Sequence, residues 1–238
     1  MRVDGRATDE LREIEIETGY QPLPEGSALI TWGETRVLCA ATVEDRTPPF
    51  LSGKSSGWVT AEYSMLPGSG NRRVRRNRTG GAGGRTHEIQ RLVGRSLRQT
   101  VDLQRLGERT VVVDCDVLVA DGGTRVASIT GGAVALRLAI NRLIVEGKLE
   151  VDPFERFVAA VSLGLVEDEC LLDLCYHEDS RAAIDMNVVA TESGELVELQ
   201  ASAERDTVTL QKLTEMARGA IETITESIVP AQKRVVNE

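Results

Sequence analysis

The sequence predicts an α+β fold, an α/β sandwich built from two similar halves. Segments with strand periodicity come first, followed by a helix, a strand, a second helix, further strands and a last helix, which differs from a regular β-α alternation. The chain has 238 residues, enough to bury a core without disulfides or metals. Hydrophobic residues make up 41% and charged residues 27%, which argues against disorder. We expect one domain, residues 1–238, with internal halves of about 1–150 and 151–238.

The first half is expected to contain five strands, two helices and a long loop. Strand patterns surround Ile14 and Ile16 and cover residues 28–32, 35–43 and 58–63, with Gly33-Glu34 as a hairpin turn. A helix is predicted over 86–106, a strand over 109–120 and a second helix over 124–145. The stretch 67–84 has no apolar periodicity and is predicted to be the loop.

The second half is expected to contain two hairpins and a closing helix. Residues 157–166 and 170–174 have strand patterns joined by the acidic turn 167–169, and residues 183–191 and 196–201 pair around 192–195. The last helix is predicted over 210–228.

The four cysteines lie in apolar contexts and are expected to be buried and reduced. No apolar run approaches the roughly 20 residues of a membrane span, and residues 1–17 lack the apolar core of a secretion signal. We therefore expect a cytoplasmic protein without a membrane partner.

Charge is distributed very unevenly along the chain. The net charge is −9, yet the stretch between Tyr63 and His87 contains six arginines and no acid. Such a basic loop predicts contact with a polyanion, and an RNA backbone is one candidate. Aromatic residues make up only 3% of the chain, so a typical aromatic RNA-binding platform is not indicated. A solvated loop without a ligand remains the alternative. The candidate RNA-binding residues are Arg72, Arg73, Arg75, Arg76 and Arg78.

Two glycine-rich segments at predicted helix starts could bind an anion. Asp121-Gly122-Gly123-Thr124-Arg125 follows a strand and opens a helix, where free amides and the helix dipole favour negative charge. Gly123, Thr124 and Arg125 would supply an amide, a hydroxyl and a guanidinium to a phosphate. Arg85 follows two glycines at the start of the preceding helix and could converge on the same anion. An ordinary glycine turn with a threonine cap remains the alternative.

Acidic residues in the second half are candidates for catalysis or metal binding. Asp185 and Asn187 share one face of a predicted strand, and Asp179 precedes it. Paired carboxylates can hold Mg²⁺ or donate a proton. Asp185 could instead be a strand-end aspartate bonded to backbone amides. Asp114 and Asp116 pose the same question on a half-exposed strand face.

Five segments, in order and spacing, resemble the ribonuclease PH family: residues 58–67, 84–91, 114–118, 121–125 and 185–189. The resemblance implies a ribosomal-protein-S5-like fold, a homo-hexamer built as a trimer of dimers, and phosphorolytic 3′→5′ trimming of tRNA precursors and other RNAs with single-stranded 3′ ends. Inorganic phosphate would be the co-substrate, nucleoside diphosphates the products, and addition of nucleotides the reverse reaction. Carried over by position, Arg85, Thr124 and Arg125 resemble the phosphate site, and Asp179 and Asp185 resemble the catalytic acids, with Mg²⁺ as the implied cofactor.

Three residues depart from the family pattern, and two other functions stay open. Gly68 stands where the family commonly has arginine, and Ala201-Ser202 stands where it usually has Gly-Thr. A non-catalytic RNA-binding subunit of an exosome-like ring is one alternative, although such a subunit would not need the anion-binding segment 121–125 or the acids Asp179 and Asp185. A hydrolytic metal nuclease using Asp114, Asp116 and Asp185 is the other.

Overall fold

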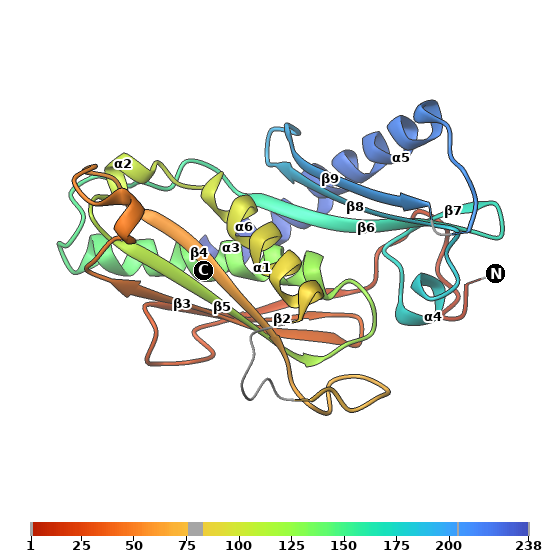
Figure 1. The fold of residues 1–238 in the computed structure, drawn as a ribbon, viewed down its shortest axis with the longest axis horizontal. Coiled ribbons are helices and arrows are strands. Elements are labelled where there is room, and N and C mark those ends of the chain that lie inside the picture. The colour runs from red at the N-terminus through yellow and green to blue at the C-terminus, as the bar shows by residue number, and fades with distance from the viewer. Residues whose placement is uncertain (1, 76–82, 204, 238) are drawn as a thin grey trace.

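The computed structural model describes residues 2–75, 83–203 and 205–237, and these form two β-sheets with a long helix between them (Figure 1). The first sheet has the strand order β1-β2-β3-β5-β4, with β4 and β5 parallel and the other neighbours antiparallel. Its strands are β1 (Ile14–Thr18), β2 (Gly26–Trp32), β3 (Thr35–Glu44), β4 (Trp58–Met65) and β5 (Thr110–Val119).

The second sheet is antiparallel throughout, with the order β7-β6-β8-β9. Its strands are β6 (Val158–Val166), β7 (Glu169–Leu172), β8 (Ile184–Thr191) and β9 (Leu196–Ala203). One contiguous apolar core contains residues of both sheets. The boundary between the two predicted halves, near residue 150, falls in the segment that joins the long helix (Thr124–Val145) to β6.

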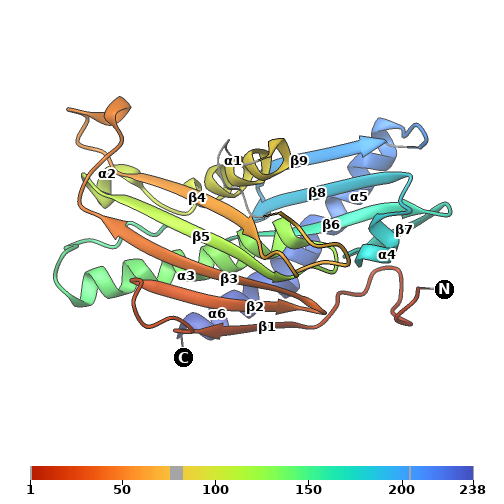
Figure 2. The same ribbon diagram turned by 60° about the horizontal axis from the view of Figure 1, so that its bottom comes forward.

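The helices are α1 (Gly84–Arg98), α2 (Leu103–Leu106), α3 (Thr124–Val145), α4 (Tyr176–Asp179), α5 (Leu210–Thr223) and α6 (Val229–Asn237), with a short 3₁₀ turn at Pro49–Leu51. Figure 2 shows α3 running along the first sheet while α5 lies against the second. Helix α3 is long and apolar enough to cross a membrane by length and composition alone, with a mean hydropathy of 1.3. Because 67% of that apolar stretch is buried, packing between the sheets accounts for its composition.

Most predicted elements are confirmed to within two residues, but the single helix predicted over 86–106 is wrong at residues 99–102, which separate α1 from α2. The chain leaves the helix because its backbone pairs with a distant segment. Asp102 N donates to Pro153 O at 2.8 Å, and Glu155 N donates to Thr100 O at 2.8 Å. Asp102 then caps the short helix α2, accepting from two backbone amides with its carboxylate.

The C-terminal helix is longer than predicted, because a wide π-helical turn at Ile224–Ile228 joins α5 to α6. Pro230 lies near the start of α6, where its missing N–H would interrupt a regular helix. The wider turn lets the helical path continue through that position.

Among the cysteines, Cys170 is only half-buried, whereas the other three are buried as expected. Helix α4 is absent from the sequence prediction, since four residues give no periodic signal.

We expect the close contact between β2 and α3 to make Gly26 sensitive to substitution. A Cβ at Gly26 would collide with the backbone of Ala135 and Ala139. Gly26→Ala should therefore lower the free energy of unfolding in urea by about 1–3 kcal/mol. Gly219→Ala is the matched control, because a Cβ on this exposed helical glycine meets nothing within 4 Å and should raise stability by about 0.5–1 kcal/mol. Equal effects of the two substitutions would contradict the packing described for β2.

Candidate active site

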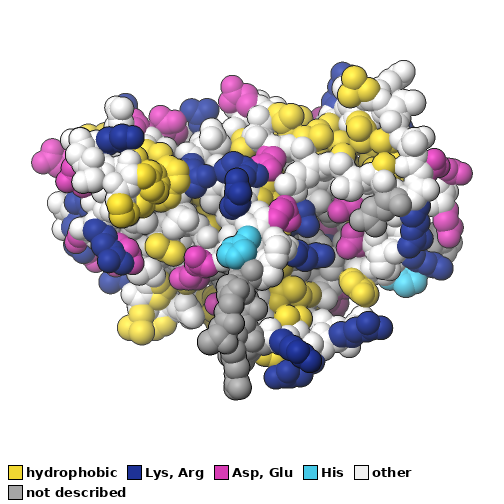
Figure 3. Space-filling model, in the orientation of Figure 1, with side chains coloured by type: hydrophobic (Ala, Val, Ile, Leu, Met, Phe, Trp, Pro, Cys, Tyr) yellow, Lys and Arg dark blue, Asp and Glu magenta, His cyan; other side chains and the backbone are white. Residues whose placement is uncertain are grey.

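A cavity of about 800 Å³ lies where the two sheets meet, and it brings most of the predicted site residues together. Figure 3 shows a hollow near the middle of one face with Lys and Arg side chains around it. Of the candidate RNA-binding arginines, Arg72 and Arg75 line the cavity, Arg73 is exposed but does not line it, and Arg76 and Arg78 lie outside the described residues. The other predicted residues that line the cavity are Arg85, Asp116, Gly122, Gly123, Thr124, Arg125, Asp179, Asp185 and Asn187.

The turn before α3 is held in a conformation that glycine alone adopts easily. Gly122 and Gly123 have φ angles of 75° and 68°, and Gly123 is the N-cap of α3. A Cβ at Gly122 would lie 2.5 Å from Leu174 O, so the segment between β7 and α4 also requires glycine there. The Thr35 hydroxyl donates to Gly122 O at 2.7 Å and accepts from Asp121 N at 2.9 Å. The turn is therefore rigid and directs the first amides of α3 toward the cavity, an arrangement that suits an anion.

Thr124 is oriented by a buried tyrosine that the sequence did not indicate. Tyr63 on β4 is 4% exposed, and its hydroxyl lies 2.9 Å from the Thr124 hydroxyl. Burial raises the pKa of the Tyr63 phenol, against the lowering effects of the Thr124 hydrogen bond and of the Arg85 and Arg125 charges. The phenol therefore stays protonated and contributes a dipole rather than a charge.

Arg125 is held in the cavity by two residues from other elements. Its Nη1 donates to Gln200 Oε1 on β9 at 3.0 Å and lies 3.5 Å from Glu88 Oε1 on α1. Gln200 Nε2 in turn donates to Glu88 at 3.1 Å and to Glu198 at 3.2 Å. An amide can accept from a guanidinium and donate to carboxylates at the same time, so Gln200 joins these charges without adding one.

The acidic residues approach the cavity from α4 and β8. Asp179 ends α4, and Asp185 lies near the start of β8, where Asn187 Nδ2 donates to Asp185 Oδ1 at 3.4 Å. The shared strand face predicted for Asp185 and Asn187 is confirmed. Both aspartates are half-buried.

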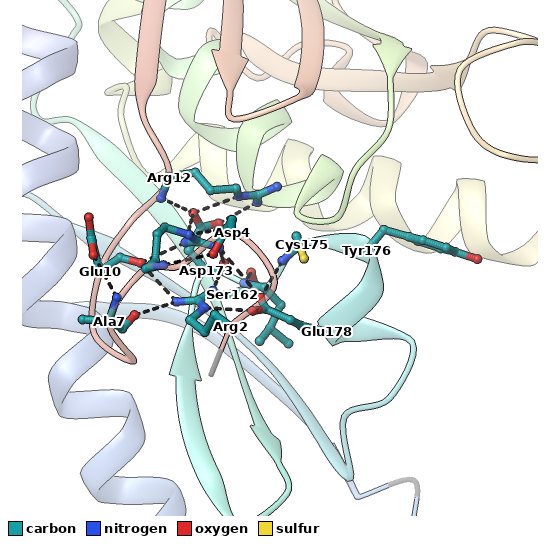
Figure 4. A network of polar contacts seen from close by, with 12 residues as sticks. Arg2, Asp4, Ala7, Glu10, Arg12, Ser162, Asp173, Cys175, Tyr176 and Glu178 are labelled. Atoms are coloured by element: carbon teal, nitrogen blue, oxygen red, sulfur yellow. Dashed lines mark hydrogen bonds and ion pairs between the residues drawn. The ribbon is translucent and has the colours of Figure 1, made fainter.

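A buried network that the sequence did not reveal lies behind the cavity (Figure 4). Asp173 is fully buried, and its carboxylate accepts from Arg12 Nε at 3.0 Å and from Arg12 Nη2 at 2.6 Å. Trp32 Nε1 donates to the same carboxylate at 2.9 Å. Arg12 Nη1 also donates to Asp121 O at 2.5 Å, so this network fixes the start of the glycine turn.

The same network holds α4 through Glu178, the neighbour of Asp179. Arg2 donates to both Glu178 oxygens at 2.8 Å, and Cys175 N donates to Oε2 at 3.1 Å. Burial raises the pKa of the Glu178 carboxyl, but the hydrogen bonds from Arg2 and Cys175 N, together with the charges of Arg2 and Arg6, leave the pKa below its ordinary value. Glu178 therefore forms a structural ion pair with Arg2, whereas its neighbour Asp179 lies at the cavity.

Asp114 and Asp116 lie on β5, and only Asp116 lines the cavity. Burial raises the pKa of both carboxyls, and for Asp114 the charges of Asp116 and Glu62 raise it further. No three His, Cys, Asp or Glu side chains form a metal-binding group within residues 2–75, 83–203 and 205–237. The structure thus does not assemble Asp114, Asp116 and Asp185 into the metal site that a hydrolytic nuclease would need.

Comparison with known proteins identifies the family of this chain. Residues 10–140 match the family described as "3' exoribonuclease family, domain 1", and residues 156–223 match domain 2 of the same family. The chain belongs to the 3′ exoribonuclease family. Among its relatives, ribonuclease PH of Moorella thermoacetica is 54% identical over 239 residues, covering 100% of this chain and 95% of that protein. Ribonuclease PH of Bacillus subtilis is 50% identical over 240 residues, covering 100% and 98%.

Solved structures confirm the fold of this exoribonuclease family member. The Archaeoglobus fulgidus exosome with RNA bound to its active site has a TM-score of 0.81 and 22% identity, covering 94% of this chain and 90% of that one. Rice Rrp46 has a TM-score of 0.80 and 19% identity, covering 100% of both chains. With ribonuclease PH relatives of about 50% identity along its length, the chain is a phosphorolytic 3′→5′ exoribonuclease and a nucleotidyltransferase.

Loss of Arg12 should destabilise this exoribonuclease strongly. Arg12→Met leaves the Asp173 carboxylate buried without its main partner, and breaking a buried pair in this way costs about 3–5 kcal/mol. Arg46→Met is the control, because Arg46 pairs with Glu44 in solvent and its loss should leave stability unchanged. Urea unfolding measures both variants, and a small effect at Arg12 would show that Asp173 finds other partners at no cost.

The acids of β5 should give stability a distinct pH dependence. The folded-state pKa of Asp114 is raised above its ordinary 3.8, so its favourable contribution is complete below pH 3.8 and is lost as pH rises through the folded-state value. Asp114→Asn should therefore be more stable than the parent at pH 7, and the gain should shrink as pH falls toward 3.8. Thermal unfolding at several pH values measures this gain. Glu34→Gln removes an exposed carboxylate and controls for the loss of one charge; a gain at Asp114 that does not vary with pH would argue against burial as the cause.

Proposed function

We propose that phosphorolysis takes place in the cavity and that the substrates include tRNA precursors and other RNAs with single-stranded 3′ ends. The observation that carries the site assignment is the meeting of the glycine turn, two arginines and two aspartates in one cavity. Phosphate and a diester are both anions, so catalysis needs cations that hold them together and a group that stabilises the leaving oxygen.

The phosphate is assigned to the amides after Gly123, the Thr124 hydroxyl and the Arg85 and Arg125 guanidiniums. One of its oxygens attacks the phosphorus of the last diester linkage. A new P–O bond forms, the bond to the 3′-oxygen of the preceding nucleotide breaks, and the terminal nucleotide leaves as a diphosphate. The shortened RNA keeps the 3′-oxygen, which takes up a proton. Reversal of these steps adds a nucleotide from a diphosphate.

Asp179 and Asp185 are assigned to the leaving 3′-oxygen, as a proton donor or as ligands of Mg²⁺. The donor set fits this ion, since Mg²⁺ is usually held by one or two carboxylates together with substrate phosphates rather than by a cage of protein ligands. When bound, Mg²⁺ supplies positive charge that stabilises the developing alkoxide. In either role, the two carboxylates hold the 3′ end of the RNA opposite the bound phosphate.

The RNA body is assigned to the arginine segment, with Arg72 and Arg75 at the cavity and Arg73, Arg76 and Arg78 in the same stretch of sequence. The A. fulgidus exosome, which shares the fold, has RNA bound to its active site, and this supports RNA as the ligand. The resemblance to ribonuclease PH also supports a cytoplasmic homo-hexamer, a trimer of dimers, and the likeness in fold to an archaeal exosome core is consistent with assembly.

The deciding experiment is product analysis on a tRNA transcript with extra 3′ nucleotides, incubated with Mg²⁺ in the presence and absence of inorganic phosphate. Nucleoside diphosphates that appear only with phosphate support the proposal, and mass spectrometry identifies them. Monophosphates released regardless of phosphate would contradict it. RNA binding without any release would favour a non-catalytic ring subunit.

Arg125→Ala should raise the KM for phosphate by about tenfold to a hundredfold, which corresponds to the removal of one charge-assisted hydrogen bond. The Kd for RNA, measured without phosphate, should change much less. Arg218→Ala removes an exposed arginine outside the cavity and serves as the control. Equal losses in phosphate and RNA affinity would contradict the role assigned to Arg125.

Substitution of the loop arginines should weaken RNA binding and reduce its salt dependence. Arg72→Ala and Arg75→Ala should each make the negative slope of log K against log salt shallower by about one unit. Each substitution removes one arginine that contacts an RNA phosphate. Filter binding of a tRNA transcript over a salt series gives the slope, and Arg36→Ala, an exposed arginine on β3, is the matched control. A slope that stays unchanged would remove the loop from the RNA site.

A further inference from the structure

One aromatic side chain lies at the mouth of the cavity. Tyr176 is the first residue of α4, is 51% exposed, and is the only aromatic among the described residues that line the cavity. Figure 4 shows its ring pointing away from the buried network around Asp173. Packing in the core therefore does not explain this tyrosine.

The backbone of Tyr176 lies between Asp179 and the glycine turn assigned to phosphate, residues 121–125, which we call the phosphate cradle. Tyr176 N donates to Asp121 Oδ1 at 3.2 Å, and a Cβ at Gly122 would lie 2.9 Å from the same nitrogen. Tyr176 and Asp179 are three residues apart on α4 and so lie on the same side of the helix. The backbone of Tyr176 thus lies next to both groups, and its side chain lines the cavity that they share.

Apolar side chains of the loop after β4 line the same cavity. Leu66 is 39% exposed and Val74 is 36% exposed. A cavity with cations at one part and an exposed ring with aliphatic groups at another suits a ligand that is both anionic and flat. A nucleotide has this chemistry, since its base offers two apolar faces and its phosphate carries the charge.

We propose that Tyr176 stacks on the base of the 3′-terminal nucleotide and so positions the last phosphodiester for attack, an inference that rests on the proposed active site. Stacking accepts every base because all four have a π-face. This suits an exonuclease, which must remove each nucleotide in turn. The aromatic contact that the arginine loop lacks is supplied by α4.

The test compares two RNA oligomers that differ only at the 3′-terminal nucleotide, which carries adenine in one and no base in the other. Binding is measured without phosphate, so that no turnover occurs. The protein should bind the adenine oligomer at least about fivefold more tightly than the abasic one. Tyr176→Phe should keep this preference, and Tyr176→Leu and Tyr176→Ala should lose it while binding the abasic oligomer as the parent does.

Tyr20→Ala is the matched control, since Tyr20 is 46% exposed and does not line the cavity. Equal binding of the two oligomers by the parent, or an undiminished preference in both Tyr176→Leu and Tyr176→Ala, would overturn the proposal. Using two variants keeps the result readable if one of them fails to fold. Because binding is read without turnover, this result is separate from the release of diphosphates, which alone decides the proposed function.

Discussion

The arrangement of the active site depends on one buried ion pair, that between Arg12 and Asp173. Taking a carboxylate and a guanidinium out of water is costly, and the cost is offset only when nearly every donor and acceptor is satisfied. Here the Asp173 carboxylate accepts from Arg12 and from Trp32, while Arg12 also donates to Asp121. The pair therefore joins the end of β7, at the edge of the second sheet, to the glycine turn that precedes α3.

This joint explains how groups from two sheets share one cavity. The phosphate cradle belongs to the first sheet and its long helix, and the acids belong to the second sheet and α4. Apolar packing alone would allow the sheets to slide, because it has little directionality. The hydrogen bonds of Arg2 to Glu178 and of Arg12 to Asp173 have fixed directions, so they set the spacing between the cradle and Asp179.

Local sequence patterns are sufficient to predict most of the fold and many of the residues that line the cavity. The alternation in β5 and the glycine start of α3 are local signals, and the bounds predicted for α3 are the bounds it has. The break after α1 cannot be predicted locally, because it results from backbone pairing with residues 153–155. The roles of Arg12 and Gln200 are also hidden, since each depends on partners far away in sequence. Asp173 does carry a signal, because it interrupts the apolar run from Leu171 to Leu174.

The distance along the chain between Arg2 and Glu178 has a consequence for synthesis. Glu178 lies 176 positions after Arg2 in the chain and is therefore synthesised much later. The first sheet and α3 can form earlier, because the contacts that they make with one another lie within residues 14–145. Helix α4 cannot be held in place until both partners are available. A nascent chain therefore lacks the complete cavity until Glu178, Asp179 and Asp185 have all been made.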